Sequence, residues 1–356
     1  MKVRACLIDQ NASCRHDGVM SCSSLIRCFA LSSCTLSAVV LSGCASVATR
    51  LPDITIPQLR SEQVKQESAA FSKLERLQAR LDRVAFPILK ANTDLCPKLS
   101  YDIGVKTHSL KNYSKALREG AERELMAGVE PSIIYIRPGS AAEKAGLQPG
   151  DKLVTAKGKA VSPYHKTLQT LFKTGERNVQ VKRGEDVFTV QVEPIEVCGY
   201  PARLSMSNAV NAYANGRSIK MTSGMMNFTE NDSELALIVG HELAHNTMGH
   251  IKKIVTNLVL SGFATRYTRP FELESDYVGL YYVARAGYKL DDIESIWRRM
   301  ALINPRSVAR AKTHPTYPDR YLRMAAARDE IKAKVEAGVS LIPNFKTNAK
   351  TPSPES

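Results

Sequence analysis

The chain is 356 residues long, carries a formal charge of +14 and is 44% hydrophobic with a single Trp, which fits a soluble globular class. This length allows two or three domains with cores of their own. The positive charge would suit an acidic partner such as nucleic acid or an anionic membrane surface. No helix-turn-helix, RNA-binding motif or basic-aromatic stripe accompanies the charge, so we interpret it as a solvated basic surface and expect no nucleic-acid partner.

Residues 1–44 are expected to form a lipoprotein signal region. An apolar stretch behind Arg27 ends in the sequence LSGC, and a basic start, a short apolar run and small residues before a cleavage site are secretory signal features. LSGC resembles a bacterial lipobox, which implies that Cys44 is lipid-modified. A buried or transmembrane helix is the alternative, but serines weaken the run relative to the ~20 apolar residues that a span needs. Residues 1–19 are too polar for the start of a signal, so Met20 is an alternative translation start.

The cysteines divide into two groups. Six of the eight lie in residues 1–44 without any C-x-x-C spacing, which disfavours a zinc finger. The mature chain keeps Cys96 and Cys198. In an oxidising periplasm an isolated pair is more often a disulfide than two thiols, so we expect these two to be bonded.

Residues 45–99 are expected to be a Pro-punctuated leader followed by a helix. Apolar residues recur at steps of three and four from Ser61 to Lys90, which predicts a helix there. We expect its apolar stripe to pack on the domain formed by residues 198–340.

Residues 100–197 have the pattern of a small β-rich domain. We expect a strand at Ile133–Ile136, a short helix between Ser140 as N-cap and Gly146 as stop, and two alternating strands around Gly184. The sequence PGSAAEKAGLQPGD resembles PDZ domains of the bacterial protease-associated kind. The resemblance implies binding of extended peptides by strand addition, and a domain kept only for packing is the alternative.

Residues 198–340 have a mostly helical pattern. Asn231 is the expected N-cap of one helix, with Glu234 as its reciprocal capping partner. Apolar residues at helical spacing then predict one buried stripe. The members of that stripe are Leu235, Ile238, Val239, Leu243 and Met248.

The same helix carries the sequence GHELAHNTMGH. His241 and His245 are four residues apart, so their imidazoles project from one face about one turn apart, as two ligands of one metal require. Glu242 is rotated by about 100° from His241, so it cannot easily ligate beside the histidines but can reach a water on the metal. H-E-x-x-H on a helix is the zinc metallopeptidase motif, with the glutamate as general base.

A catalytic zinc needs a third protein ligand and one open position. His250 is rejected because nine residues beyond His241 on one helix is the opposite face; we expect it at the helix surface or hydrogen-bonded behind a ligand. Glu272 and Asp276 lie four apart on a second expected helix. One of them can bind zinc while the other accepts a hydrogen bond from a ligand imidazole.

Taken together, H-E-x-x-H at His241–His245 and E-x-x-x-D at Glu272–Asp276 resemble the metallopeptidase family of the CAAX prenyl protease, HtpX and the periplasmic BepA. The resemblance implies one Zn²⁺ per chain, with Glu272 as third ligand and Asp276 behind a ligand histidine. It also implies an α+β fold, with a mainly helical zincin-type domain, an edge β-strand and the small PDZ-like domain.

Two further stretches resemble the same family. VNAYANGRSIKMTSGMM resembles its substrate-pairing edge strand, which implies that Asn211, Ala212 and Ala214 pair with substrate. THPTYPDR resembles its H-P-x-x-x-x-R element, which implies that His314 or Arg320 faces the reacting carbonyl. His314 could either stabilise the oxyanion or occupy the open metal position as a gate.

The sequence therefore predicts a zinc endopeptidase lipid-anchored in the Gram-negative envelope, at the outer membrane rather than the inner, that degrades misfolded envelope proteins. Residues 341–356 are expected to be a disordered tail. The first alternative is a PDZ-bearing chaperone or scaffold with a silenced or structural zinc site, against which Glu242 argues because binding does not need it. The second is a thermolysin-like secreted protease, which gives no reason for the lipobox.

Overall fold

The computed structural model describes residues 51–260, 268–310 and 314–344. The signal region 1–44, with Met20 and Cys44, lies outside these residues. The chain divides into Met1–Asp53 and Ile54–Ser356, and every element below belongs to the second unit. Within the described residues, no helix combines the length and the apolar character needed to cross a membrane.

The long helix α1 (Ile56–Ala91) confirms the helix predicted from Ser61, but it begins five residues earlier. The Thr55 side chain accepts a hydrogen bond from the Gln58 backbone N–H, and Pro57 lies in the first turn. Proline is favourable there because a first-turn N–H has no intrahelical acceptor. Pro57 therefore marks the start of this helix, whereas residues 51–55, with Pro52, precede it and lie outside any helix.

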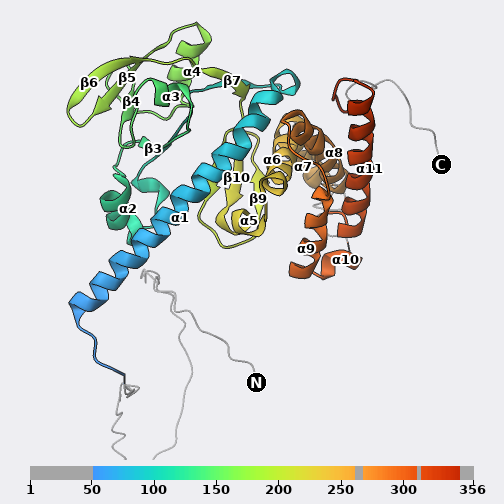
Figure 1. Cartoon of the computed structure of the whole chain (residues 1–356), viewed down its shortest axis with the longest axis horizontal. Helices are drawn as coiled ribbons and strands as arrows, with labels where there is room; N and C mark the ends of the chain where they lie inside the picture. The colour runs from blue at the N-terminus through green and yellow to red at the C-terminus, as the bar shows by residue number, and fades with distance from the viewer. Residues whose placement is uncertain (1–50, 261–267, 311–313, 345–356) are drawn as a thin grey trace, which may run out of the picture. The chain divides into compact units, whose positions relative to one another are not determined.

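The small domain, which follows α1 in the sequence and precedes the C-terminal domain, contains three separate sheets (Figure 1). In the first, β1 pairs antiparallel with β7, and in the second β2 pairs antiparallel with β3. The third has the antiparallel order β4-β5-β6. The strands are β1 (Leu99–Asp102), β2 (Val105–His108), β3 (Ser132–Ile136), β4 (Lys152–Val154), β5 (Asn178–Arg183), β6 (Asp186–Gln191) and β7 (Ile195–Cys198).

Short helices complete the small domain, and its local predictions are confirmed. The predicted strand is β3, the Ser140 hydroxyl caps the one-turn helix that follows by accepting from the Glu143 N–H, and Gly184 turns between β5 and β6 with φ +59°. The helical elements are η1 (Thr93–Leu95), η2 (Leu110–Asn112), η3 (Lys115–Leu117), α2 (Arg118–Leu125), α3 (Ala141–Lys144) and α4 (Lys166–Lys173).

A buried ion network fastens the small domain to α1. The Asp82 carboxylate of α1 is 3% exposed and lies 2.7 Å from Lys106 Nζ and 3.2 Å from Arg137 Nη1. Arg137 also lies over the Phe86 ring of α1 and bonds Asp102. A disulfide between Cys96 and Cys198 joins the two ends of the small domain, 102 residues apart in sequence.

The C-terminal domain places a three-stranded sheet beside a cluster of helices. The sheet order is β8-β10-β9, with β8 parallel and β9 antiparallel to β10. The strands are β8 (Ala202–Ser205), β9 (Ala212–Ala214) and β10 (Ile219–Thr222). The helices are α5 (Ser223–Phe228), α6 (Asp232–Thr247), α7 (His250–Leu260), α8 (Arg269–Arg285), η5 (Ile293–Ser295), α9 (Ile296–Ile303), α10 (Arg306–Ala309) and α11 (Tyr317–Glu336).

The central helix α6 differs from its prediction in two respects. Asn231 caps it as expected, accepting from the Glu234 N–H, but Glu234 does not cap in return. Its carboxylate accepts from the Glu230 N–H and forms two hydrogen bonds with Arg299. The predicted stripe is buried from Leu235 to Leu243, but the burial extends further, because α6 is buried on every side from Glu234 to Asn246 between α8, α1 and β9.

The C-terminal boundary is also corrected. Residues 341–344 lie against the helices instead of starting a disordered tail: Arg285 donates to the Leu341 carbonyl, and Lys334 Nζ donates to the Ile342 carbonyl. Asn344 Nδ2 donates to the Glu330 carboxylate. Residues 345–356 lie outside the described residues.

Helices α6 and α8 meet at two glycines. A Cβ on Gly279 of α8 would lie 2.7 Å from the His241 N, and a Cβ on Gly240 of α6 would lie 2.6 Å from the Gly279 carbonyl oxygen. Real Cβ atoms essentially never come this close, so the backbones touch only because both residues lack one.

We therefore expect Gly279→Ala to lower the free energy of unfolding. Overpacking costs about 1–3 kcal/mol or more, which exceeds the roughly 1 kcal/mol that Ala gains over Gly in a helix. Chemical denaturation measures the change. Gly128→Ala is the matched control, because a Cβ there meets nothing within 4 Å. Unchanged or increased stability of Gly279→Ala would contradict the close crossing.

Candidate metal centre and active site

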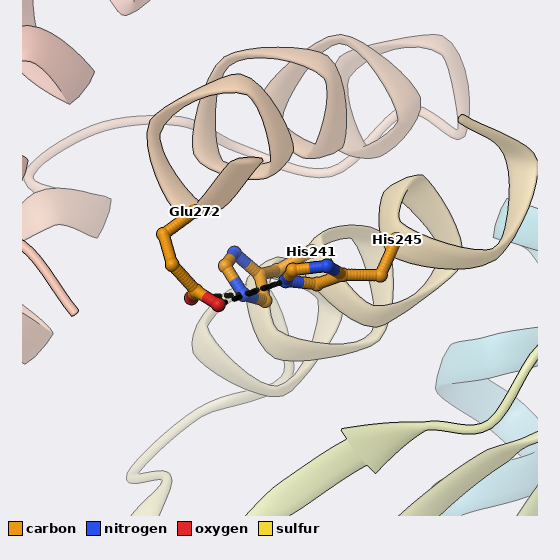
Figure 2. A group of neighbouring side chains, drawn as sticks. All are labelled: His241, His245 and Glu272. Carbon is orange, nitrogen blue, oxygen red and sulfur yellow. Dashed lines mark hydrogen bonds and ion pairs between the residues drawn. The ribbon is translucent and has the colours of Figure 1, made fainter. Parts of the chain in front are cut away.

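Three buried side chains converge where α6 and α8 cross (Figure 2). His241 Nε2 lies 3.1 Å from His245 Nε2, and each of these nitrogens lies 3.5 Å from an oxygen of Glu272. A tetrahedral ion with ligand bonds of about 2.0–2.1 Å holds its ligand atoms about 3.3 Å apart. The triangle therefore has the dimensions of three ligands around one small cation.

The chemistry of these atoms also fits a cation. Glu272 Oε2 is buried and has no hydrogen-bond donor among the described residues. A buried carboxylate oxygen without a partner is costly, and so are two imidazole nitrogens that face each other. A metal ion between the three groups would satisfy all of them at once.

His241 is held by a carboxylate behind it. Its Nδ1 lies 2.9 Å from Asp276 Oδ1, which is the arrangement of an N–H donating to a carboxylate. With the proton on Nδ1, the lone pair of Nε2 points at the metal position. Asp276 is the residue expected behind a ligand histidine, and the structure places it there.

Arg320 lies on the far side of the same imidazole. Its guanidinium donates to both Asp276 oxygens at 2.6 and 2.7 Å and lies 3.6 Å over the Trp297 ring. Only 5% of Arg320 is exposed. Of the two residues expected at the reacting carbonyl, Arg320 is therefore directed to Asp276 and supports His241 through it, which leaves His314 as the candidate.

The structure decides between the two places expected for His250. It is fully buried, so it does not lie at the helix surface and instead lies behind His245. The rotation argument assumed one continuous helix, but α6 ends at Thr247, Gly249 adopts φ +66°, and α7 starts at His250. The chain reverses there, and the imidazole turns back toward His245.

His250 lies behind the second ligand histidine. Its Nδ1 is 3.3 Å from His245 Nδ1 and 3.0 Å from Ser275 Oγ, and its Nε2 is 2.5 Å from Glu274 Oε2. A proton on His250 Nε2 that is donated to Glu274 leaves Nδ1 free to accept from His245. His245 Nε2 then carries a lone pair toward the metal position, as His241 does. The sequence reasoning missed Glu274 and Ser275; the glycine before His250 was the signal for a turn.

Glu242 lies beside the ligands and beside β9. It is 7% exposed and accepts a hydrogen bond from the Ala214 backbone N–H. Burial and the charge of Glu272 raise its pKa to about 7, against the opposing effect of His241. A carboxylate with a pKa near neutrality is well suited to accept a proton in catalysis.

The predicted edge strand lies next to this glutamate. Ala212 and Ala214 belong to β9, whose one neighbour in the described sheet is β10, and Asn211 directly precedes the strand. The Asn211 backbone is fixed by the Thr222 hydroxyl, which donates to its carbonyl. The outer edge of β9 therefore offers backbone groups to an extended chain close to Glu242.

His314 lies close to the candidate ligands, although it is 42 residues beyond Glu272 in the sequence. Its Nε2 lies 3.4 Å from Glu272 Oε2, while 55% of its side chain remains exposed. This position is next to a ligand atom and also open to an incoming substrate, so it is compatible with both expected functions.

Without a metal, a proton on His241 compensates for the acidic groups around it. Burial opposes this charge, but the hydrogen bond with Asp276 and the nearby carboxylate of Glu272 raise the pKa of His241 to about 10. Burial lowers the pKa of His245 to about 4. Burial disfavours ionised Glu272, but its interactions with the two histidines, 3.5 Å away, outweigh burial and hold its pKa well below the usual range.

We expect metal binding to release about one proton at pH 8, because a ligand imidazole must be neutral and only His241 is charged there. The pKa of His241 is raised in the metal-free state, so protonation at low pH favours that state over the metal-bound one. The metal affinity should therefore rise with pH below about 10. Calorimetry of zinc binding in buffers of different ionisation enthalpy measures the released proton. Affinity that is independent of pH between 6 and 9 would contradict this protonation state.

We also expect His250→Ala to weaken zinc binding about 10- to 100-fold, as loss of a residue behind a metal ligand does. Competition with a chelating dye measures the affinity. His250→Leu fills the space without accepting a hydrogen bond and should behave like His250→Ala, whereas His250→Gln offers an acceptor and should restore part of the affinity. Wild-type affinity in His250→Leu would show that His250 only packs.

Two histidines and a carboxylate lie on crossed helices, with a glutamate next to the first histidine and an edge strand alongside, which is the arrangement expected of a zincin-type metallopeptidase site. Residues 191–261 match the model of Peptidase family M48, a segment that contains the edge strand and both histidines. The fold and the matched family support a metalloendopeptidase.

Two known proteins are similar to parts of the chain. The mitochondrial metalloendopeptidase OMA1 of Arabidopsis thaliana is 25% identical over 132 residues, which cover 31% of this chain and 27% of that protein. The chain thus spans just over a quarter of the length of this curated relative. A crystal structure of the HtrA3 PDZ domain bound to a phage-derived ligand covers 28% of this chain and 89% of that domain at 20% identity. Its TM-score of 0.20 is too low to support an argument about the small domain.

Proposed function

We propose that the protein is a zinc-dependent endopeptidase with Glu242 as its general base. The observation that carries this proposal is the triangle of His241, His245 and Glu272, with a buried carboxylate of raised pKa next to it. When bound by these three residues, zinc would polarise the scissile carbonyl and make water more acidic. A chaperone or scaffold needs the ligands at most, but it has no use for Glu242 in this position.

In this proposal, different residues align the substrate, transfer the proton and hold the ligands. The β9 edge aligns the substrate backbone, which places a peptide bond beside Glu242. Glu242 accepts the proton of the attacking water and can return it to the leaving amine. Asp276 and Arg320 hold His241, while His250 and Glu274 hold His245, so neither ligand can rotate during the reaction.

The cellular setting is a further part of the proposal. Cys44, in its lipobox-like sequence, would anchor the chain to the outer membrane on its periplasmic side, and the substrates would be misfolded envelope proteins. The small domain, with its PDZ-like sequence PGSAAEKAGLQPGD, would select extended segments of these substrates. The Cys96–Cys198 disulfide is in keeping with an oxidising compartment.

Glu242→Gln should abolish proteolysis and leave zinc binding stoichiometric, because the glutamate moves a proton and is not a ligand. Casein cleavage should fall by at least about 100-fold, the usual range for loss of a general base. Glu185→Gln, at an exposed turn, is the control and should cleave normally. In the unmodified protein, o-phenanthroline should stop cleavage and added zinc should restore it. Loss of zinc from Glu242→Gln would assign it as a ligand instead.

His314→Ala should raise basal proteolysis, because His314 Nε2 lies at a ligand oxygen, where it can block the open metal position. The measurement is the initial rate of cleavage of a short fluorogenic peptide. A drop of about 100-fold would instead assign His314 to oxyanion stabilisation. An unchanged rate would rule out both functions.

A further inference from the structure

A groove of about 670 Å³ lies away from the catalytic edge of the sheet, between the small domain and the C-terminal domain. One wall is a run of six consecutive residues, 201–206, which contains the whole of β8. The opposite wall includes three consecutive residues of β2, 106–108. Both walls are therefore formed by consecutive residues of a strand.

The β8 edge is open in the described part of the sheet. Within the order β8-β10-β9, its one neighbour is β10. The Pro201 carbonyl accepts from the Ile219 N–H, and in a parallel pair alternate residues direct their backbone groups to the same neighbour. Arg203 therefore bonds with β10, and the N–H and C=O groups of Ala202 and Leu204 are directed away from β10. Ala202 is 3% exposed and Leu204 is half-buried, so Leu204 is the more accessible of the two.

Two cations lie side by side at this edge. Arg203 of β8 and Lys220 of β10 are in register and line the groove. No ion pair of either is found among the described residues, and Lys220 Nζ lies 5.5 Å from the centre of the Tyr213 ring. Like charges opposite each other are unfavourable unless an anion lies between or beside them. The groove lining contains no Asp or Glu, and its third cation, Lys106, is bound to Asp82.

The lining of the groove also includes one polar side chain from α1 and two exposed apolar side chains. Gln78 Nε2 is buried at the groove and has no acceptor among the described residues. Leu117 and Met206 are 37% and 56% exposed and also line the groove. The lining thus combines backbone groups, an amide, two unpaired cations and apolar contacts, which is the mixture that an extended polypeptide would satisfy.

We propose that this groove is a second polypeptide-binding site, in which an extended segment with carboxylates at alternate positions adds as a strand to β8. Alternation places every second side chain on the face that carries Arg203 and Lys220. A nucleic acid could neutralise the cations but has no backbone N–H and C=O pattern to pair with the strand edge. We assign this segment to a substrate that is cleaved at β9, the opposite edge of the same sheet. This assignment rests on the proposed function.

The test is binding of a fluorescent decapeptide of alternating Thr and Glu to the Glu242→Gln protein, measured by fluorescence anisotropy. We expect it to bind at least about tenfold more tightly than a decapeptide of alternating Thr and Lys. The double variant Arg203→Glu with Lys220→Glu should reverse this preference. Lys289→Glu, an exposed charge outside the groove, should leave it unchanged.

Methylated peptides test strand addition without altering the protein. N-methyl groups on the amides of one edge of the Thr-Glu peptide should abolish binding, and those on the other edge should have little effect. Equal affinity for both decapeptides, equal loss from methylation of either edge, or equal competition by a single-stranded oligonucleotide would overturn the proposal. Cleavage of a short neutral peptide by the Arg203→Glu and Lys220→Glu variant should match the unmodified protein, so failure here is separable from failure of the peptidase assignment.

Discussion

The contact between the backbones of α6 and α8 is the constraint on which the site depends. At Gly240 and Gly279 no side chain separates the helices, and this brings Glu272 of α8 within 3.5 Å of both histidines of α6. A carboxylate side chain is short, so a helix separation set by ordinary core residues would leave it out of reach. The candidate metal site therefore depends on helix packing, because a side chain at either glycine would force the two helices apart.

The same crossing buries a set of charges that must be compensated within the protein. Each ligand histidine has its own acidic support: Asp276 with Arg320 behind His241, and Glu274 through His250 behind His245. Both supports direct the Nε2 lone pairs to one point, and they keep the imidazoles from rotating. Three of the supporting residues come from α8 or α11, so the helix that supplies the third ligand also orients the first two.

Local spacing made much of this site predictable. H-E-x-x-H and E-x-x-x-D each lie on one helix, where a separation of four residues fixes which side chains share a face. The turns and strands of the small domain followed for the same reason, because Ser140 and Gly184 act on their immediate neighbours. Predictions failed where the partner was distant or the element was not continuous. Glu234 bonds with Arg299 rather than with the backbone N–H of the N-cap residue. His250 follows Gly249, whose positive φ interrupts the continuous helix that the rotation argument assumed.

The three-stranded sheet links the catalytic site to the rest of the molecule. Its central strand β10 is paired on both sides, and its two outer strands present open edges in opposite directions within the described sheet. The β9 edge lies next to the carboxylate of Glu242, whereas the β8 edge faces Lys106 and the small domain.

A buried ion network connects the small domain to this sheet. Asp82 of α1 binds Lys106 and Arg137, and α1 packs on both β8 and α6. The small domain therefore cannot move far from β8 without breaking this network. Breaking such a network is expensive, because it leaves a charge buried without its partner.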